Sequence, residues 1–101
     1  MTDRYLNELR EIILQNLKDL RLKVYLFGSR ANGVARTGSD CDIGIDPLQE
    51  LPVGLLSRLG EKLEESHVPY EVELVDLSEV RSEFAEKIRE EGLLWIDTSK
   101  G

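Results

Sequence analysis

Apolar residues recur at spacings of three and four in three parts of the chain, which predicts three amphipathic helices. The first is expected from Arg4 to about Leu20, the second begins at Pro52, and the third extends from Ser78 to about Glu91. Proline suits a first helical turn, serine suits a helix cap, and Gly92 is expected to end the third helix. The predicted buried stripes are Leu6, Leu9, Ile13, Leu17 and Leu20, then Leu55, Leu56, Leu59 and Leu63, then Val80, Phe84 and Ile88.

Short apolar or alternating runs between these helices predict strands. They span Val24–Phe27, Cys41–Ile45, Tyr70–Val75 and Leu93–Ile96. Because side chains alternate along a strand, Cys41, Ile43 and Ile45 should face the core and Asp42 the other side. The order of elements predicts one α/β (α+β) domain over residues 1–101, with a small mixed sheet and helices packed mainly on one face.

Charge is distributed unevenly along the 101 residues. Residues 1–39 hold seven basic and four acidic side chains, net +3, whereas residues 40–101 hold six and sixteen, net −10. The total of −7 argues against a long nucleic acid as direct substrate, because an acidic surface repels a phosphate backbone. A short anion such as ATP stays compatible, since a bound metal offsets the repulsion locally.

The chain carries no feature of a membrane or secreted protein. No apolar run approaches the roughly 20 residues of a membrane span. The acidic first residues lack the apolar segment of a signal peptide. Cys41 is the one cysteine, so no internal disulfide can form. We therefore expect a cytoplasmic protein.

The residues that carry chemistry lie between the first two predicted strands. Gly28-Ser29 is followed by ten residues and then by Asp40-Cys41-Asp42. Backbone amides at a glycine and a serine hydroxyl suit phosphate oxygens. Asp40 and Asp42 project from the same side of a strand, and carboxylates together with substrate phosphates suit Mg²⁺. The spacing predicts a site for a metal-bound triphosphate.

Each of these residues also has a simpler interpretation. Asp40 and Asp42 could be two solvent-exposed acids, although aspartate is disfavoured in strands. Gly28-Ser29 alone would be an ordinary turn. Arg30 and Arg36 could contact phosphates or could be solvated loop arginines, and the sequence leaves both open.

The motif resembles the active-site signature of the minimal nucleotidyltransferases, the smallest members of the DNA polymerase beta-like superfamily. That signature is Gly-Ser, ten residues, then Asp-x-Asp, and the flanking Arg30-Ala31-Asn32-Gly33 and Arg36-Thr37-Gly38-Ser39 are also similar. The resemblance covers nearly the whole chain. It implies a nucleotidyltransferase-like fold, two Mg²⁺ ions, and transfer of a nucleoside monophosphate, AMP from ATP, to an acceptor hydroxyl.

The resemblance also implies a third carboxylate on a neighbouring strand. Glu73 takes that position if Val72 and Leu74 face the core, although the family has aspartate there. Asp40, Asp42 and Glu73 are then the expected catalytic and metal-binding residues, and Gly28, Ser29, Arg30 and Arg36 the expected phosphate-binding residues. Glu71 is the reserve candidate. Asp46 and Asp76 each end a predicted strand and are interpreted as turn residues.

Proteins of this kind are commonly paired with a small helical HEPN-domain protein, often as its antitoxin, and can adenylylate it. The resemblance therefore implies a HEPN-type partner as acceptor. The alternative is a non-catalytic, nucleotide-binding module that neutralises its partner by contact. A metal-dependent phosphohydrolase is a weaker third interpretation. The acceptor, the nucleotide base and a homo-oligomer stay open at this stage.

Overall fold

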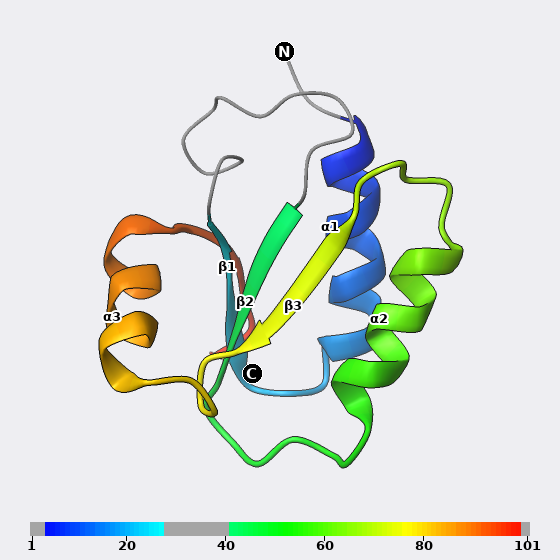
Figure 1. The fold of residues 1–101 in the computed structure, drawn as a ribbon. Coiled ribbons are helices and arrows are strands. Elements are labelled where there is room, and N and C mark those ends of the chain that lie inside the picture. Colours follow the sequence, from blue (N-terminus) through cyan, green and yellow to red (C-terminus); the bar gives the residue numbers. More distant parts are fainter. Residues whose placement is uncertain (1–3, 28–40, 100–101) are drawn as a thin grey trace.

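A computed structural model of the protein describes residues 4–27 and 41–99. These residues form three helices and four strands, as Figure 1 shows. In chain order they are α1 (Arg4–Leu17), β1 (Leu22–Phe27), β2 (Cys41–Pro47), α2 (Leu55–Glu65), β3 (Val72–Asp76), α3 (Ser82–Glu91) and β4 (Leu93–Asp97). The predicted α/β class and the predicted order of elements are confirmed.

The four strands form one mixed sheet in the order β3-β2-β1-β4. Strand β1 pairs antiparallel with β2 and with β4, whereas β2 and β3 pair parallel. A parallel pair needs a crossover connection, which α2 supplies between β2 and β3. Strands β3 and β4 therefore lie at the two edges of the described sheet.

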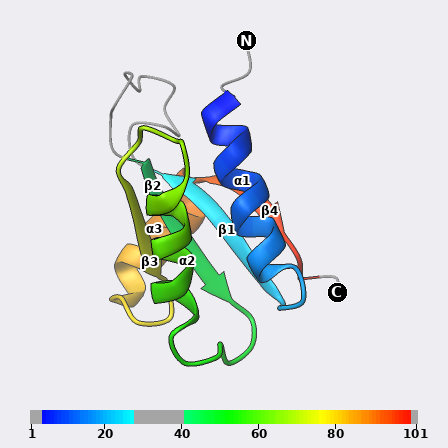
Figure 2. The ribbon, with the colours of Figure 1, turned by 90° about the vertical axis from the view of Figure 1, so that its right-hand side faces the viewer.

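Helices cover both faces of the sheet, α1 and α2 on one face and α3 on the other (Figures 1 and 2). Leucine and isoleucine side chains of α1 and α2 pack with one face of β1, β2 and β3 in the main core. Helix α3 packs on the opposite face, where Ala85 and Ile88 meet Tyr25 and Leu77. None of the helices in the described residues is long and apolar enough to cross a membrane.

The buried stripes follow the predicted periodicity on the first two helices. Leu9, Ile13 and Leu17 of α1 are at most 1% exposed, while Leu59 and Leu63 of α2 are at most 3% exposed. Burial of each such side chain stabilises the fold by about 1.5–3 kcal/mol. The remaining predicted stripe residues of α1 and α2 are half-buried and pack against the same core: Leu6, Leu20, Leu55 and Leu56.

Two helices begin later than predicted because local turns occupy the expected first residues. Pro52 lies in a turn, where its carbonyl oxygen accepts a hydrogen bond from Leu55 N–H at 3.2 Å, and Gly54 precedes α2 with a left-handed φ of 79°. Ser78 does not cap α3. Its N–H and its hydroxyl both donate to Asp76 Oδ1, at 2.8 and 2.6 Å, so the turn predicted for Asp76 is confirmed.

Asp46 was interpreted as a turn residue, and this is wrong. It lies inside β2, is 9% exposed, and its carboxylate accepts two hydrogen bonds from Arg89 of α3. The two distances are 3.0 Å to Nε and 3.1 Å to Nη2. The hydrogen bond to Asp46 raises the pKa of the Arg89 guanidinium. This bidentate pair attaches the last turn of α3 to the sheet.

Phe84 was predicted to be buried, but it is 42% exposed. The buried stripe of α3 runs through Ala85 and Ile88, which are 2% and 3% exposed. Phe84 lies at the margin of that stripe, where its ring contacts Phe27 edge-on. The small side chain of Ala85 is thus buried in place of Phe84. This fits the close approach of α3 to the sheet.

The end of α3 has no room for a side chain at Gly92. A Cβ atom there would lie 2.5 Å from the carbonyl oxygen of Ile88 and 3.4 Å from that of Leu26. Gly60, in the middle of α2, differs because its Cβ would meet only Leu74 Cδ1 at 4.0 Å. The two glycines thus offer a matched pair of substitutions.

We expect Gly92→Ala to lower the free energy of unfolding by about 1–3 kcal/mol, because backbone atoms must shift to accept the methyl group. Gly60→Ala should raise it by roughly 0.5–1 kcal/mol, since alanine is the better helix former. Thermal unfolding followed by circular dichroism measures both. Equal effects of the two substitutions would contradict the close packing at Gly92.

Candidate functional site

The candidate site lies at the end of the sheet where β1 ends and where β2 and β3 begin (Figure 1). Phe27, the last residue of β1, is paired with Asp42 of β2, which is paired with Glu73 of β3. Neighbouring strands lie about 4.8 Å apart, and paired residues project from the same face. Asp42 and Glu73 therefore lie next to each other on the face that α3 covers in part.

The register of β2 and β3 confirms which of their residues were predicted to face the core. Cys41 is paired with Val72 and Ile43 with Leu74, and all four belong to the main core or pack against it. Asp42 is half-buried and Glu73 is exposed. The reserve candidate, Glu71, precedes β3, and its carbonyl oxygen accepts a hydrogen bond from Cys41 N–H at 2.7 Å.

Five predicted site residues lie outside the described residues. They are Gly28, Ser29, Arg30, Arg36 and Asp40. Gly28 directly follows the last residue of β1, and Asp40 directly precedes the first residue of β2. Their assignments as phosphate-binding and metal-binding residues stay predictions.

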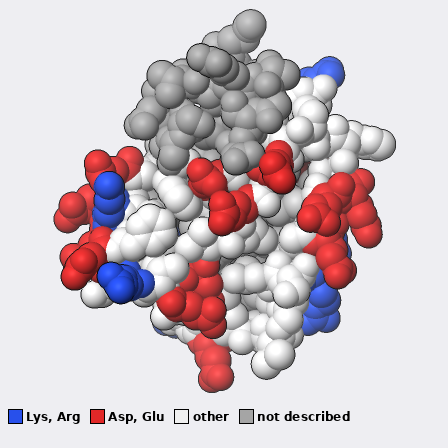
Figure 3. All heavy atoms as spheres, in the orientation of Figure 1, with Lys and Arg blue, Asp and Glu red and all other residues white. Residues whose placement is uncertain are grey.

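Acidic side chains surround the described part of the site. Figure 3 shows red carboxylates directly below the grey residues, whereas blue basic side chains lie toward the margins of this view. Glu71 and Glu73 are exposed, and Asp42, which is paired with Glu73, is half-buried. A concentration of negative charge at this end of the sheet favours a bound cation and disfavours an unaccompanied phosphate.

The donor set is chemically suited to Mg²⁺, which prefers carboxylate oxygens together with waters and substrate phosphates. Asp42 and Glu73 are adjacent carboxylates on rigid strands. Within residues 4–27 and 41–99, no three acidic, histidine or cysteine side chains gather closely enough to hold a metal. Asp40, which alternation predicts on the same side of the strand as Asp42, stays the predicted third carboxylate beside them.

The aromatic pair beside Asp42 was missed from the sequence. The rings of Phe27 and Phe84 meet nearly perpendicular, with centroids 6.2 Å apart and an interplanar angle of 85°. Phe27 is half-buried. The position of Phe27 directly before Gly28 was the only indication in the sequence that its ring lies near the site. Its contact with Phe84 could not be predicted, because that contact depends on how α3 packs on the sheet.

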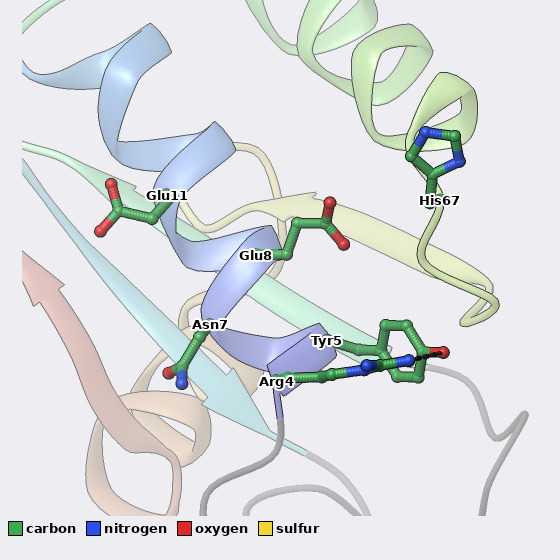
Figure 4. Close-up of a pocket in the computed structure, with 6 residues that line it drawn as sticks. All are labelled: Arg4, Tyr5, Asn7, Glu8, Glu11 and His67. Carbon is green, nitrogen blue, oxygen red and sulfur yellow. Dashed lines mark hydrogen bonds between the residues drawn. The ribbon is translucent and has the colours of Figure 1, made fainter.

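A separate pocket of about 570 Å³ lies along α1 and beside His67 (Figure 4). Arg4 donates a hydrogen bond to the Tyr5 hydroxyl at 3.1 Å, and Tyr5 contacts Tyr70 edge-on. The residues that line the pocket are Arg4, Tyr5, Asn7, Glu8, Glu11 and His67. Tyr5 and Tyr70 pack on the main core, so this pocket is on the face opposite Asp42 and Glu73.

Comparison with known proteins adds an independent observation. The family described as "Polymerase beta, Nucleotidyltransferase" matches residues 7–100. The chain is 40% identical over 68 residues to the Probable protein adenylyltransferase MntA of Haemophilus influenzae. That match covers 65% of this chain and 58% of the relative, so the chain spans less than two thirds of the curated relative's length.

Two solved structures share the fold over most of the chain. One is a toxin–antitoxin with AMP-PNP, with 28% identity and a TM-score of 0.69 over 90% of this chain and 75% of that one. The other is the tri-AMPylated Shewanella oneidensis HEPN toxin in complex with MNT antitoxin. Its identity is 25% and its TM-score 0.69, over 99% of this chain and 76% of that one.

Two aspartates of the same strand should respond differently to substitution. We expect Asp42→Asn to weaken Mg²⁺-dependent ATP binding by roughly 10- to 100-fold, because even residues that only orient metal ligands contribute that much. Asp46→Asn should retain this binding but lose about 1–3 kcal/mol of stability, since Arg89 loses a charged partner. Calorimetric titration of ATP with Mg²⁺ or EDTA, together with thermal unfolding, measures both.

The outcome that would contradict the metal site is equal ATP binding by wild type and Asp42→Asn, with and without Mg²⁺. Loss of binding in Asp46→Asn, in protein that remains folded, would contradict its structural role.

Proposed function

The chain belongs to the polymerase beta nucleotidyltransferase family, and we propose that it transfers AMP from ATP to a hydroxyl group of a protein acceptor. The observation that carries the proposal is the register of Asp42 with Glu73, beside the strand end that leads into Gly28-Ser29. Two aligned carboxylates next to a predicted phosphate loop suit phosphoryl chemistry better than any other group in the described residues.

Asp40, Asp42 and Glu73 are the residues that would hold two Mg²⁺ ions in this proposal. Bound there, Mg²⁺ supplies positive charge that offsets the negative charge developing on the phosphate oxygens. The acidic surroundings of the site are consistent with this arrangement, because Glu71 adds further negative charge at the same end of the sheet.

The protein's own groups have distinct parts in the transfer. Glu73 takes the proton of the acceptor hydroxyl, whose oxygen forms a bond to the α-phosphorus of ATP. The bond between that phosphorus and the bridging oxygen breaks, and pyrophosphate leaves. Backbone amide and hydroxyl groups of Gly28 and Ser29 bind the β- and γ-phosphates, and Arg30 and Arg36 balance their charge.

The similar proteins support ATP and a HEPN-type protein as the two reactants. One solved relative contains AMP-PNP, another contains an AMPylated HEPN toxin, and the curated relative is named a protein adenylyltransferase. The net charge of −10 over residues 40–101 favours a protein acceptor over a long nucleic acid. Such a reaction uses cytoplasmic ATP and Mg²⁺, so we place the protein in the cytoplasm.

One observation favours a second candidate function, a binding module that neutralises its partner without chemistry. The third acid is a glutamate where the family has aspartate, so its carboxylate lies one methylene farther from the strand. A carboxylate displaced by about 1 Å can lower a rate on the order of 10²-fold. In that case ATP would bind and transfer would be slow or absent.

The transfer can be tested with α-labelled ATP, Mg²⁺ and the protein encoded next to this gene. We expect label and an AMP-sized mass increase on that protein, detected by autoradiography and intact-mass spectrometry. The label should be lost with Asp40→Asn, because the metal set is then incomplete. Inhibition of the partner without label, unchanged by Asp40→Asn, would favour the binding module. Label on tRNA or DNA would contradict the argument from charge.

The two neighbouring glutamates provide a matched control for the third carboxylate. Glu73→Gln should lower the initial rate of AMP transfer by about 10²- to 10⁴-fold, the usual contribution of a general base. Glu71→Gln should leave most of the rate, because Glu71 precedes β3 and is not paired with Asp42. The reverse pattern would identify Glu71 as the third acid, and normal rates in both variants would exclude both residues.

A further inference from the structure

Phe84 is unusual among the aromatic residues of this chain. All six aromatic side chains are in described residues, and Phe84 is the only one of them that is exposed. Its 42% exposure occurs on the first turn of α3, beside the apolar stripe that packs on the sheet. The large apolar ring of Phe84 is thus partly in contact with water, whereas the small side chain of Ala85 next to it is buried. The fold does not gain the full stabilisation that burial of the ring would give.

The exposed ring is connected to the candidate site through Phe27. Phe27 holds Phe84 edge-on and is itself paired with Asp42 on the neighbouring strand. Asp42 is paired with Glu73, so these four residues follow one another across the same face of the sheet. An apolar aromatic surface therefore adjoins the two described carboxylates.

The position of Phe84 is fixed by the packing of α3. A Cβ atom on Gly44 would lie 3.3 Å from Ile88 Cγ2, so the helix lies directly against the strand that bears Asp42. The Arg89–Asp46 pair holds the last turn of the same helix to the same strand. A binding surface on an element restrained in this way is preorganised for a ligand.

We propose that Phe84, supported by Phe27, is the surface on which the base of the bound nucleotide stacks. This inference rests on the proposed function. The base is the uncharged part of ATP with flat apolar faces, and aromatic side chains bind such faces of any base. The base is therefore the part of ATP that can bind an apolar ring beside acidic residues, because it carries no negative charge.

The order of residues across the sheet favours the nucleotide base over an aromatic group of the acceptor. In phosphoryl transfer the attacking and leaving oxygens lie roughly in line, on opposite sides of the phosphorus. In the proposed reaction, Glu73 lies beside the attacking hydroxyl, and Gly28 binds the phosphates that leave. Phe27 is covalently joined to Gly28 and separated from Glu73 by Asp42. The aromatic pair is therefore on the side away from the attacking hydroxyl, which disfavours an aromatic group of the acceptor as its ligand.

The test compares ATP with inorganic tripolyphosphate, which offers phosphates without a base. Both are titrated with Mg²⁺ into wild type, Phe84→Ala, Phe84→Tyr and Leu48→Ala. Leu48 is the control because it is 44% exposed and follows the far end of β2 from Asp42. We expect Phe84→Ala to weaken ATP binding by roughly 5- to 20-fold and tripolyphosphate binding not at all. Phe84→Tyr and Leu48→Ala should bind both ligands as wild type does.

Other results would overturn the inference. An equal loss for both ligands would mean that Phe84 only supports the fold, and unchanged ATP binding would mean that the base does not touch it. Normal ATP binding with lost transfer to the partner would assign the ring to the acceptor. If wild type binds no ATP, the proposed function fails as well. If Asp42→Asn loses ATP binding and Phe84→Ala keeps it, only this inference fails.

Discussion

The register of β2 against its two neighbours is the constraint on which both the core and the candidate site depend. Side chains alternate along β2, so the register that buries Ile43 and Ile45 also aligns Asp42 with Glu73. A slip of one residue would turn Asp42 toward α1 and α2, into an apolar core. Burying a carboxylate there without a partner is strongly unfavourable. The apolar contacts that stabilise the fold therefore also hold the carboxylates together.

The outward positions of β2 divide this face of the sheet between structure and chemistry. Asp46 binds Arg89, Gly44 gives α3 the space to approach, and Asp42 lies next to Glu73. Residues of α3 contact or adjoin the first two positions, whereas Glu73 beside the third is exposed. The ion pair and the glycine thus hold α3 over Asp46 and Gly44, and Glu73 stays accessible to a ligand.

Much of the fold could be predicted from the sequence because periodicity records burial directly. The apolar stripes located α1 and α2, and the alternation in β2 and β3 located Glu73 beside Asp42. Residues whose roles depend on distant partners could not be predicted. Ser78 donates a hydrogen bond to Asp76 instead of capping a helix. Asp46 accepts a hydrogen bond from Arg89, which lies forty-three residues later in the chain. The phosphate-binding part of the site is predicted from its motif alone.

The glutamate at position 73 bears on how fast the proposed transfer can be. A rigid carboxylate misplaced by about 1 Å lowers a rate on the order of 10²-fold. Glu73 is exposed on an edge strand, so its rotamers can adjust to bring the carboxylate back toward the other ligands. Ordering such a side chain costs up to about 1.5–2 kcal/mol, which corresponds to roughly 10- to 30-fold. Because this penalty is smaller than that of a rigid misplacement, an exposed glutamate is compatible with transfer at a reduced rate, and its exposure favours the enzyme rather than the module.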